Sequence, residues 1–420
     1  MLSRAPFDSL WIWREPRIAR ALSWYREVAC DRMPAKFRIA ATIPVAVDVE
    51  EAGEEELAGE LRRLTPQFLA RREALRHGRE RLGPPVEGAS LLELCRALAA
   101  RMLERCTFCR WECRIDRSRG GRLGACKLEA ASRVSCAFHH QGEELVLRGL
   151  DGSGTIFFTS CNMRCAFCQN GDISTDRDNG EPVSGRDLAT LAWLLRREGC
   201  HNINWVGGEP AIHLHRIVEA INLLGRGFTP SAEDIARVRT VKVDRLEWYD
   251  IRPEVGVFAD GFNVPILWNS NMFLTGRAMD ILRILVDIWL PDFKFGPGRC
   301  AIRLARTPRY WDTVTACLAK LAEWGEDVLV RHLVMPGHVE CCTRPVLDWL
   351  AARMPEVPVN IMDQYRPDMF ADPRSPLFRQ EYREIARRPA QEELARAFAH
   401  ARARGLCFEE VSFEKRRLFA

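Results

Sequence analysis

GSGTIFFTSCNMRCAFC, residues 152–168, joins a short apolar run to three closely spaced cysteines. The run follows a glycine turn and is typical of a buried β-strand, and the cysteines begin where that strand should end. Cys161, Cys165 and Cys168 have the spacing C-x3-C-x2-C, so each thiol can hold one iron of a four-iron cluster. Iron–sulfur clusters normally have four thiolate ligands. Three cysteines therefore leave one iron open, as a catalytic metal site requires.

A second motif lies at the end of another predicted strand. His201–Val206 has a β-type pattern and runs directly into Gly207-Gly208-Glu209-Pro210. Glycines allow the backbone to approach a ligand closely, and a glutamate can accept hydrogen bonds from an ammonium group. We therefore expect these residues to contribute to a ligand site.

The composition of the 420-residue chain is that of an ordinary globular protein, with 47% hydrophobic and 28% charged residues. A net charge of +4, from 61 basic and 57 acidic residues, gives no clear nucleic-acid or membrane signal. No apolar run is long enough to span a bilayer, and the N-terminus lacks a secretory pattern, so we expect a cytoplasmic protein. The 16 cysteines then indicate metal binding more than disulfides.

From Thr155 onward, short β-type runs alternate with helical patterns. This alternation predicts parallel βα units in an α/β fold. We expect strands at residues 155–160, 201–207, 264–269, 286–293, 327–334 and 357–362. In barrels of such units the chemistry gathers at the C-terminal ends of the strands, and both motifs lie at such ends.

Four helices are predicted from apolar periodicity and end signals. Two precede the first strand, at Glu54–Gly78, with a break near Pro66, and at Leu91–Arg105. A third spans Ser184–Glu198 and has a capping-box-like start. A fourth is expected to begin at Thr307-Pro308, a capping residue followed by proline.

A second cysteine group precedes the first. Cys106, Cys109, Cys113 and Cys126 follow the pattern C-x2-C-x3-C-x12-C, with glycines before the last cysteine that would let the chain turn back. Four such thiols could bind zinc or a second iron–sulfur cluster, and the spacing does not separate the two. The group would be either a structural knuckle or an auxiliary cluster that relays electrons or engages substrate.

Two pairs of adjacent residues carry potential metal ligands. His139 and His140 lie on an extended segment, where neighbouring side chains point to opposite faces, so they cannot easily share one ion. Cys341 and Cys342 are also adjacent, and we expect no metal role for them.

The cysteine loop and the GGEP sequence together resemble the radical S-adenosylmethionine (SAM) superfamily. Further blocks, among them CTFCRWECRIDR, DIWLPDFKF and VRHLVMPGH, resemble an uncharacterised group related to the pyruvate formate-lyase activating enzymes. The resemblance implies a partial (β/α)6 TIM-like barrel. It also implies a [4Fe-4S] cluster on Cys161, Cys165 and Cys168, whose open iron chelates SAM.

The same resemblance implies roles at the strand ends. Glu209, within Gly207-Gly208-Glu209, would bind the SAM ammonium group, and Asn269 and Ser270 would lie near the ribose. Asp292 and Lys294 match an Asp-x-Lys strand end in which the lysine lies near SAM, although an ion pair that closes the strand is the alternative.

One position departs from the pattern. Met272 stands where these proteins have a glycine, so the approach of the backbone to SAM is open to question there. His332 and Tyr365, near two later strand ends, are as compatible with core packing as with function.

Four domains or segments are predicted. They are a helical N-terminal extension over residues 1–105, a cysteine-rich module over 106–150, the partial barrel over 151–370 and a C-terminal helical segment over 371–420. The extension is expected to pack on the protein's own core. Residues 225–260 form a polar interruption, expected to be part of a lid or partner surface.

The predicted reaction is reductive cleavage of SAM to a 5′-deoxyadenosyl radical that abstracts hydrogen from a substrate. An external donor such as flavodoxin or ferredoxin would supply the electron. Activation of a glycyl radical enzyme is one hypothesis for the substrate, and another macromolecule or a metabolite is the alternative. A non-catalytic iron–sulfur redox module is the non-enzymatic alternative.

Overall fold

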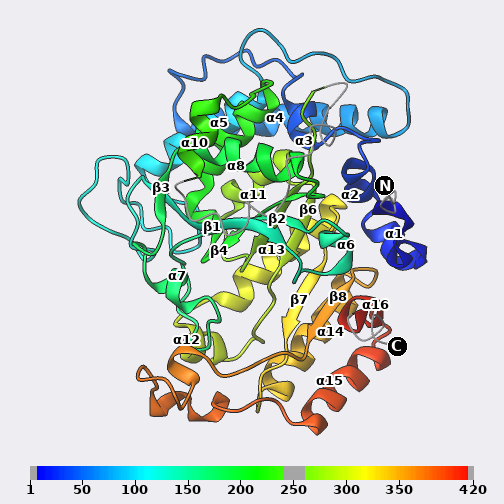
Figure 1. Ribbon diagram of the computed structural model, residues 1–420, viewed down its shortest axis with the longest axis vertical. Coiled ribbons are helices and arrows are strands. Elements are labelled where there is room, and N and C mark those ends of the chain that lie inside the picture. The colour runs from blue at the N-terminus through cyan, green and yellow to red at the C-terminus, as the bar shows by residue number, and fades with distance from the viewer. Residues whose placement is uncertain (1–6, 240–260, 415–420) are drawn as a thin grey trace.

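Six parallel strands form the centre of the molecule in a computed structural model that describes residues 7–239 and 261–414 (Figure 1). The six are β2 (Ser153–Phe158), β4 (Ile203–Gly207), β5 (Ile266–Ser270), β6 (Ile288–Pro291), β7 (Val330–Leu333) and β8 (Val359–Met362). The first four share one sheet in the order β2-β4-β5-β6, and β7 pairs with β8. Parallel bridges Trp289–Val328 and Asp292–Arg331 join β6 to β7, which gives an open barrel. All six predicted strands are confirmed.

Two further strands extend the sheet beyond β2. β1 (Ser132–His140) pairs antiparallel with β2, and β3 (Glu181–Val183) pairs antiparallel with β1 at the edge. The sequence prediction missed both. β1 has a register shift between Val134 and Cys136 that breaks its alternation of buried and half-buried residues, and β3 has only three residues. Short or bulged edge strands carry a weak periodic signal.

The helices cover both sides of the strands. In Figure 1, α4, α5, α8 and α10 gather on one side of the sheet, and α14 and α16 lie beside β7 and β8. The α-helices span α1 Pro16–Ala21, α2 Ser23–Ala29, α3 Lys36–Ala40, α4 Glu54–Arg76, α5 Leu91–Glu104, α6 Leu145–Arg148, α7 Gly171–Thr175, α8 Gly185–Arg197, α9 Leu214–Gly225, α10 Ala232–Val238, α11 Gly276–Leu285, α12 Cys300–Ala305, α13 Tyr310–Trp324, α14 Arg344–Arg353, α15 Gln391–Ala403 and α16 Glu409–Ser412.

Two of the helix predictions require correction. The helix α4 continues through Pro66, because this proline is exposed while Leu64 and Phe68 on either side of it are buried. Their packing outweighs the cost of about 3 kcal/mol for an interior proline. The helix expected from Thr307 begins only at Tyr310, because Thr307 closes the preceding α12 by donating its backbone N–H to the Ala301 carbonyl.

The capping box predicted for α8 is present. The Ser184 backbone N–H donates to the Asp187 carboxylate (2.8 Å), and the Asp187 N–H donates to the Ser184 hydroxyl (3.1 Å). α10 lies within the predicted interruption and packs on α8 through an Arg186–Asp234 ion pair (2.6 Å). The lid or partner role predicted for this interruption falls partly on residues 240–260, which lie outside the described ranges.

The N-terminal helices close the amino ends of the barrel strands. Backbone N–H groups of this extension donate to side chains that precede β6 and β7: Lys36 to Asp287 (3.0 Å) and Tyr25 to Asp327 (2.8 Å). The extension therefore packs on the protein's own core, as expected. Across the described ranges, no helix combines the length and apolarity needed to cross a bilayer.

Candidate active site

The two glycines of the GGEP motif pack β4 against the segment that leads into the three cysteines. Gly207 has a φ of +115°, and a Cβ there would collide with the Phe158 backbone. A Cβ on Gly208 would collide with the Ser160 carbonyl group. The described structure uses the glycines to hold the two motifs together, and their role in admitting a ligand stays a prediction. Glu209 is thereby fixed beside the start of the cysteine loop.

Glu209 is buried, and its carboxylate is held between two strand ends. It accepts hydrogen bonds from the Ser270 hydroxyl (2.7 Å), the Asn271 N–H (2.9 Å) and the Ala211 N–H (3.2 Å). Burial raises the pKa of Glu209 to about 7 despite these donors. A buried carboxyl group in this state gains most from a cationic partner, because a nearby positive charge offsets the cost of ionisation.

Asn271 connects the end of β5 to the cysteine loop. Its side-chain amide donates to the Asn162 side-chain oxygen (2.8 Å) and points at the Cys161 sulfur (3.8 Å). The sequence analysis selected Asn269 and Ser270 and overlooked Asn271. The run Asn269-Ser270-Asn271, three polar residues after an apolar strand, was the available signal. Asn269 is itself buried, paired with Leu290 of β6.

The thiols of Cys161, Cys165 and Cys168 are neighbours within one loop. Burial raises the pKa of all three, that of Cys165 to about 12, and the Cys168 sulfur lies 3.3 Å from the Ser174 hydroxyl. Within the described ranges these sulfurs do not form a set in which all ligand atoms lie within 4.8 Å of one another. The three sulfurs are therefore not gathered around a single ion, and three thiols of one loop can each bind a different iron of a cluster.

Lys294 and Asp292 form an ion pair at the end of β6. The Lys294 N–H donates to the Tyr310 hydroxyl (2.9 Å), which donates to the Asp292 carbonyl (3.0 Å). Burial opposes the charge on Lys294, but the interaction with Asp292, with smaller contributions from the Cys165 and Cys168 side chains, outweighs it, so the pKa of Lys294 is raised. The strand-closing ion pair is thus present, and its cation faces the cysteine loop.

Met272 adopts the backbone conformation that a glycine would provide. Its φ is +58°, in the left-handed region, and its side chain is fully buried. Its N–H donates to the Ser270 hydroxyl (3.0 Å), so this turn also orients the serine that contacts Glu209. Met272 thus takes up the left-handed backbone conformation that favours glycine. Strained residues of this kind cluster at functional sites.

His332 and Tyr365, which the sequence leaves open between core packing and function, both form hydrogen bonds inside the core. The His332 ring contacts the Phe293 carbonyl (2.7 Å) and the Thr343 hydroxyl (2.9 Å), and burial lowers its pKa to about 4. The Tyr365 hydroxyl donates to the Ile385 carbonyl (2.7 Å). Both side chains are satisfied in the core.

The adjacent histidines diverge, as predicted. The His139 ring binds the Asp151 carbonyl (2.7 Å) and the Glu198 carboxylate (2.7 Å), whereas the His140 ring faces Glu143 (3.0 Å). The two rings therefore serve separate contacts and do not share a site.

The cysteine-rich module lies against the three-cysteine loop. The Trp111 indole N–H donates to the Asn162 carbonyl (2.7 Å), and the Arg164 guanidinium donates to the Ala125 carbonyl (2.6 Å). Gly124 packs against the Cys113 sulfur, so a Cβ at this position would clash with it. In the described structure, the group formed by Cys106, Cys109, Cys113 and Cys126 does not gather its sulfurs as tightly as a single ion requires.

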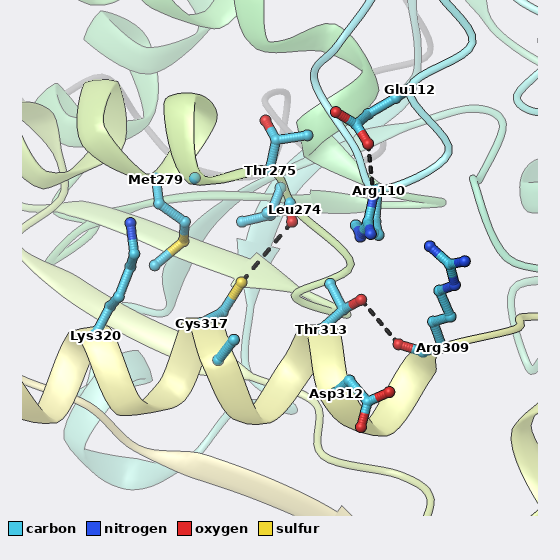
Figure 2. Close-up of a pocket in the computed structure, with 12 residues that line it drawn as sticks. Arg110, Glu112, Leu274, Thr275, Met279, Arg309, Asp312, Thr313, Cys317 and Lys320 are labelled. Atoms are coloured by element: carbon cyan, nitrogen blue, oxygen red, sulfur yellow. Dashed lines mark hydrogen bonds and ion pairs between the residues drawn. The ribbon is translucent and has the colours of Figure 1, made fainter.

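A cavity of about 590 Å³ borders this module. Figure 2 shows that its walls come from the module, the start of α11 and one face of α13. Its charged lining residues carry both signs and are Arg110, Glu112, Arg309, Asp312 and Lys320. No cysteine of the 161–168 loop lines it, so it is distinct from the site built around Glu209.

Comparison with known proteins identifies the family. The model of the radical SAM superfamily matches residues 155–350. The uncharacterized protein MJ0674 of Methanocaldococcus jannaschii is 32% identical over 314 residues, which cover 73% of this chain and 77% of that protein. The chain belongs to the radical SAM superfamily. Membership implies a [4Fe-4S] cluster and SAM, and the spacing of the three thiols and the buried Glu209 fit these two groups.

Solved structures of SuiB from Streptococcus suis are also similar to this radical SAM protein. The complex with the precursor peptide SuiA aligns with a TM-score of 0.38 and 12% identity, and the complex with SAM aligns with a TM-score of 0.38 and 11% identity. Each covers 60% of this chain, and the chain spans less than half of SuiB, at 46% and 48%.

Proposed function

We propose that this protein is an enzyme that cleaves SAM reductively, with its cluster on Cys161, Cys165 and Cys168 and the SAM ammonium group on Glu209. The observation that carries the proposal is the buried Glu209 carboxylate, which Ser270 and Asn271 hold beside the cysteine loop. When bound, the cluster and SAM would supply a 5′-deoxyadenosyl radical for hydrogen abstraction.

The residues around the loop support this proposal through charge and packing. Lys294 places a positive charge beside Cys165 and Cys168, which would offset part of the negative charge that thiolate ligands bring. Phe167 packs on Phe295 (ring centroids 6.2 Å apart) and on Tyr365 (5.7 Å), so aromatic rings cover one side of the loop. Such a cover would exclude water from a reactive site.

The substrate class follows from the resemblance to activating enzymes. We propose hydrogen abstraction from a glycine of a partner enzyme, with the electron supplied by a flavodoxin or ferredoxin. Another macromolecule or a metabolite is the second candidate, because one fold can host many different reactions. A redox module without turnover would not need SAM, and the buried Glu209 carboxylate would then have no cationic ligand. This alternative is therefore disfavoured.

A binding experiment tests the SAM site. The protein is reconstituted anaerobically with iron and sulfide and titrated with SAM, while the electron paramagnetic resonance signal of the reduced cluster is recorded. SAM should change this signal in the wild type and in a Cys30→Ser control, since Cys30 lies outside both cysteine groups. A cluster signal that SAM leaves unchanged would contradict the proposal.

A further inference from the structure

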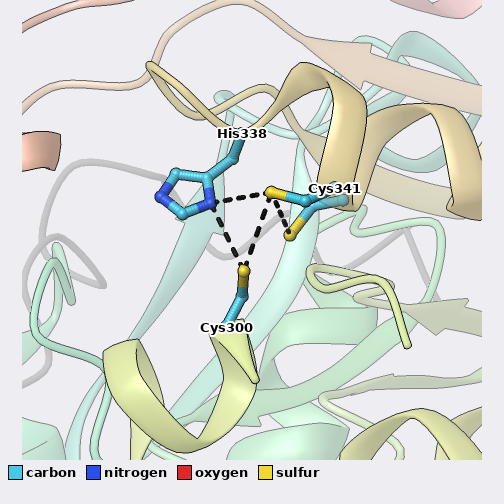
Figure 3. Close-up of side chains that lie close together, drawn as sticks. Cys300, His338 and Cys341 are labelled. Carbon is cyan, nitrogen blue, oxygen red and sulfur yellow. Dashed lines mark hydrogen bonds between the residues drawn. The ribbon is translucent and has the colours of Figure 1, made fainter. Parts of the chain in front are cut away.

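A third group of metal-ligand side chains lies at the N-terminal end of α12, whose C-terminal end contacts the cysteine loop. Cys300 is the first residue of α12, His338 follows β7, and Cys341 and Cys342 belong to a π-helical turn over Val339–Thr343. Figure 3 shows the thiols and the imidazole converging from these segments. Their four ligand atoms all lie within 4.8 Å of one another.

The distances within this group match the edges of one coordination tetrahedron. The Cys300 and Cys341 sulfurs are 3.7 Å apart and those of Cys341 and Cys342 are 3.9 Å apart. The His338 Nδ1 lies 3.5 Å from the Cys300 sulfur and 3.3 Å from the Cys341 sulfur. A tetrahedral zinc ion with bonds of about 2.3 Å to sulfur and about 2.05 Å to nitrogen has edges of about 3.8 Å and about 3.6 Å.

The π-helical turn explains how adjacent cysteines contribute to one site. Successive residues of a regular α-helix point in directions about 100° apart, and a π-bulge alters this spacing locally, often at functional sites. Gly296 makes room for the turn, because a Cβ at this position would collide with the Cys341 carbonyl group. Cys300, His338 and Cys342 are buried and Cys341 is exposed, which leaves an entry path for an ion.

A second layer of contacts orients the histidine. The His338 Nε2 atom, on the side of the ring away from the thiols, lies 3.7 Å from the Glu384 carboxylate. Glu384 in turn pairs with Arg303 of α12 (2.6 Å). A metal-bound histidine typically has a carboxylate on its other ring nitrogen. A disulfide among these cysteines would require neither His338 nor Glu384. Their positions therefore favour a metal site.

We propose that Cys300, His338, Cys341 and Cys342 bind one structural zinc ion that fixes α12 beneath the three-cysteine loop. Three thiolates and one imidazole are a common closed donor set for zinc. A cubane cluster would need its ligands on different irons and therefore farther apart than one tetrahedral edge. Zinc would stabilise the fold directly, because binding free energy at a structural site is folding free energy.

The C-terminal end of α12 is hydrogen-bonded to the three-cysteine loop. The carbonyl groups of Leu304 and Ala305 accept hydrogen bonds from the N–H groups of Ala166 (2.8 Å) and Arg164 (3.0 Å), both of which lie between the loop cysteines. An ion that holds the first residue of α12 would therefore hold the acceptors of the loop backbone. This second part of the inference rests on the proposed function, whereas zinc binding itself does not.

Metal analysis of purified protein tests the zinc site. Zinc and iron are counted for the wild type, the Cys300→Ser/Cys341→Ser double variant, the Cys161/Cys165/Cys168 triple alanine variant and the Cys30→Ser control. The double variant should lose one equivalent of zinc, and the triple variant and the control should keep it. Equal zinc in the wild type and a folded double variant, or iron in place of that zinc equivalent, would overturn the proposal.

Two measurements keep the test decisive if the double variant fails to fold. Zinc-edge X-ray absorption of a Cys106→Ser/Cys109→Ser variant, which removes any zinc bound by that group, should show three sulfurs and one nitrogen. Absence of zinc, or an intact mass that shows a disulfide at Cys300, would overturn the site. The zinc site is also proposed to order the 161–168 loop through α12. This part would be wrong if Glu384→Gln releases zinc but leaves iron loading of the loop unchanged. A wild type with zinc but without SAM cleavage would refute only the proposed function.

Discussion

At the residue scale, the decisive feature is the buried carboxyl group of Glu209, whose pKa burial raises to about 7. Glu209 lacks a nearby cation strong enough to restore its usual pKa, although it accepts three hydrogen bonds. Buried acids with raised pKa values are typical of functional sites, where a ligand of opposite charge can stabilise the ionised form. Two predictions follow from its charge.

Replacing Glu209 with glutamine should weaken SAM binding roughly tenfold to a hundredfold, because a charge-assisted hydrogen bond becomes a neutral one. The glutamine carbonyl can still accept from Ser270 and Ala211, which share one carboxylate oxygen in the wild type, whereas the Asn271 N–H loses its acceptor. Because the cysteine ligands are unchanged, the loop should still assemble its cluster. Anaerobic calorimetry with SAM and an iron assay on the same sample measure both quantities. A variant with unchanged SAM affinity would remove Glu209 from the binding site.

The affinity for SAM should also depend on pH. With a pKa of about 7, Glu209 is mostly protonated at pH 6 and mostly ionised at pH 8. An ammonium ligand needs the ionised form, so affinity should rise from about pH 6 to about pH 7, where an α-amino group with a pKa of about 7.7–8.0 still keeps most of its protons. The Glu209→Gln variant should show a flat profile. Affinity that falls over this range in the wild type would contradict the assignment.

At the element scale, the contact between β4 and β2 joins the two motifs, and Gly208 allows it. Replacing Gly208 with alanine would place a Cβ against the Ser160 carbonyl group. We expect a loss of stability of about 1–3 kcal/mol and poorer iron loading, since overpacking forces backbone shifts. Gly53→Ala is the matched control, because no atom lies within 4 Å of its added Cβ. Thermal denaturation and iron content that match the control would contradict this role of Gly208.

The elements also show how far sequence reasoning reaches. The six parallel strands follow from local apolar runs, and the cysteine loop and GGEP lie within short stretches, so both could be predicted. The start of α13 could not, because Thr307 caps the helix before it rather than the one after it. Asn271 and the Cys300–His338 pair escaped prediction because their partners are distant in sequence and meet only in the folded chain.

At the scale of the whole molecule, the N-terminal extension is tied to the barrel through buried acids. Burial raises the pKa of Asp287 to about 6 and that of Asp327 to about 7, and each accepts backbone N–H donors from the extension. Lys36 and Glu326 form a buried ion pair beside them. The extension therefore belongs to the same cooperative structure as the barrel.

This arrangement predicts a particular pH dependence of stability. Between about pH 4 and pH 7 the folded chain keeps protons on Asp287 and Asp327 that the unfolded chain has released, so the contribution of these groups to stability falls as the pH rises. Asp327→Asn retains an acceptor for the Tyr25 N–H and should reduce this fall by on the order of 2–4 kcal/mol. Urea denaturation at pH 5 and pH 8 measures the difference. An identical slope in the variant and the wild type would show that Asp327 is ionised in the folded protein.

The production of 5′-deoxyadenosine by the reconstituted protein tests the central claim most directly. Wild-type protein and a Cys165→Ala variant are loaded with iron and sulfide, reduced with dithionite and incubated anaerobically with SAM, and the nucleoside is quantified. The wild type should release 5′-deoxyadenosine together with methionine, and the variant, which lacks one iron ligand, should release neither. A wild type that carries its full cluster and binds SAM but forms no 5′-deoxyadenosine would contradict the assignment.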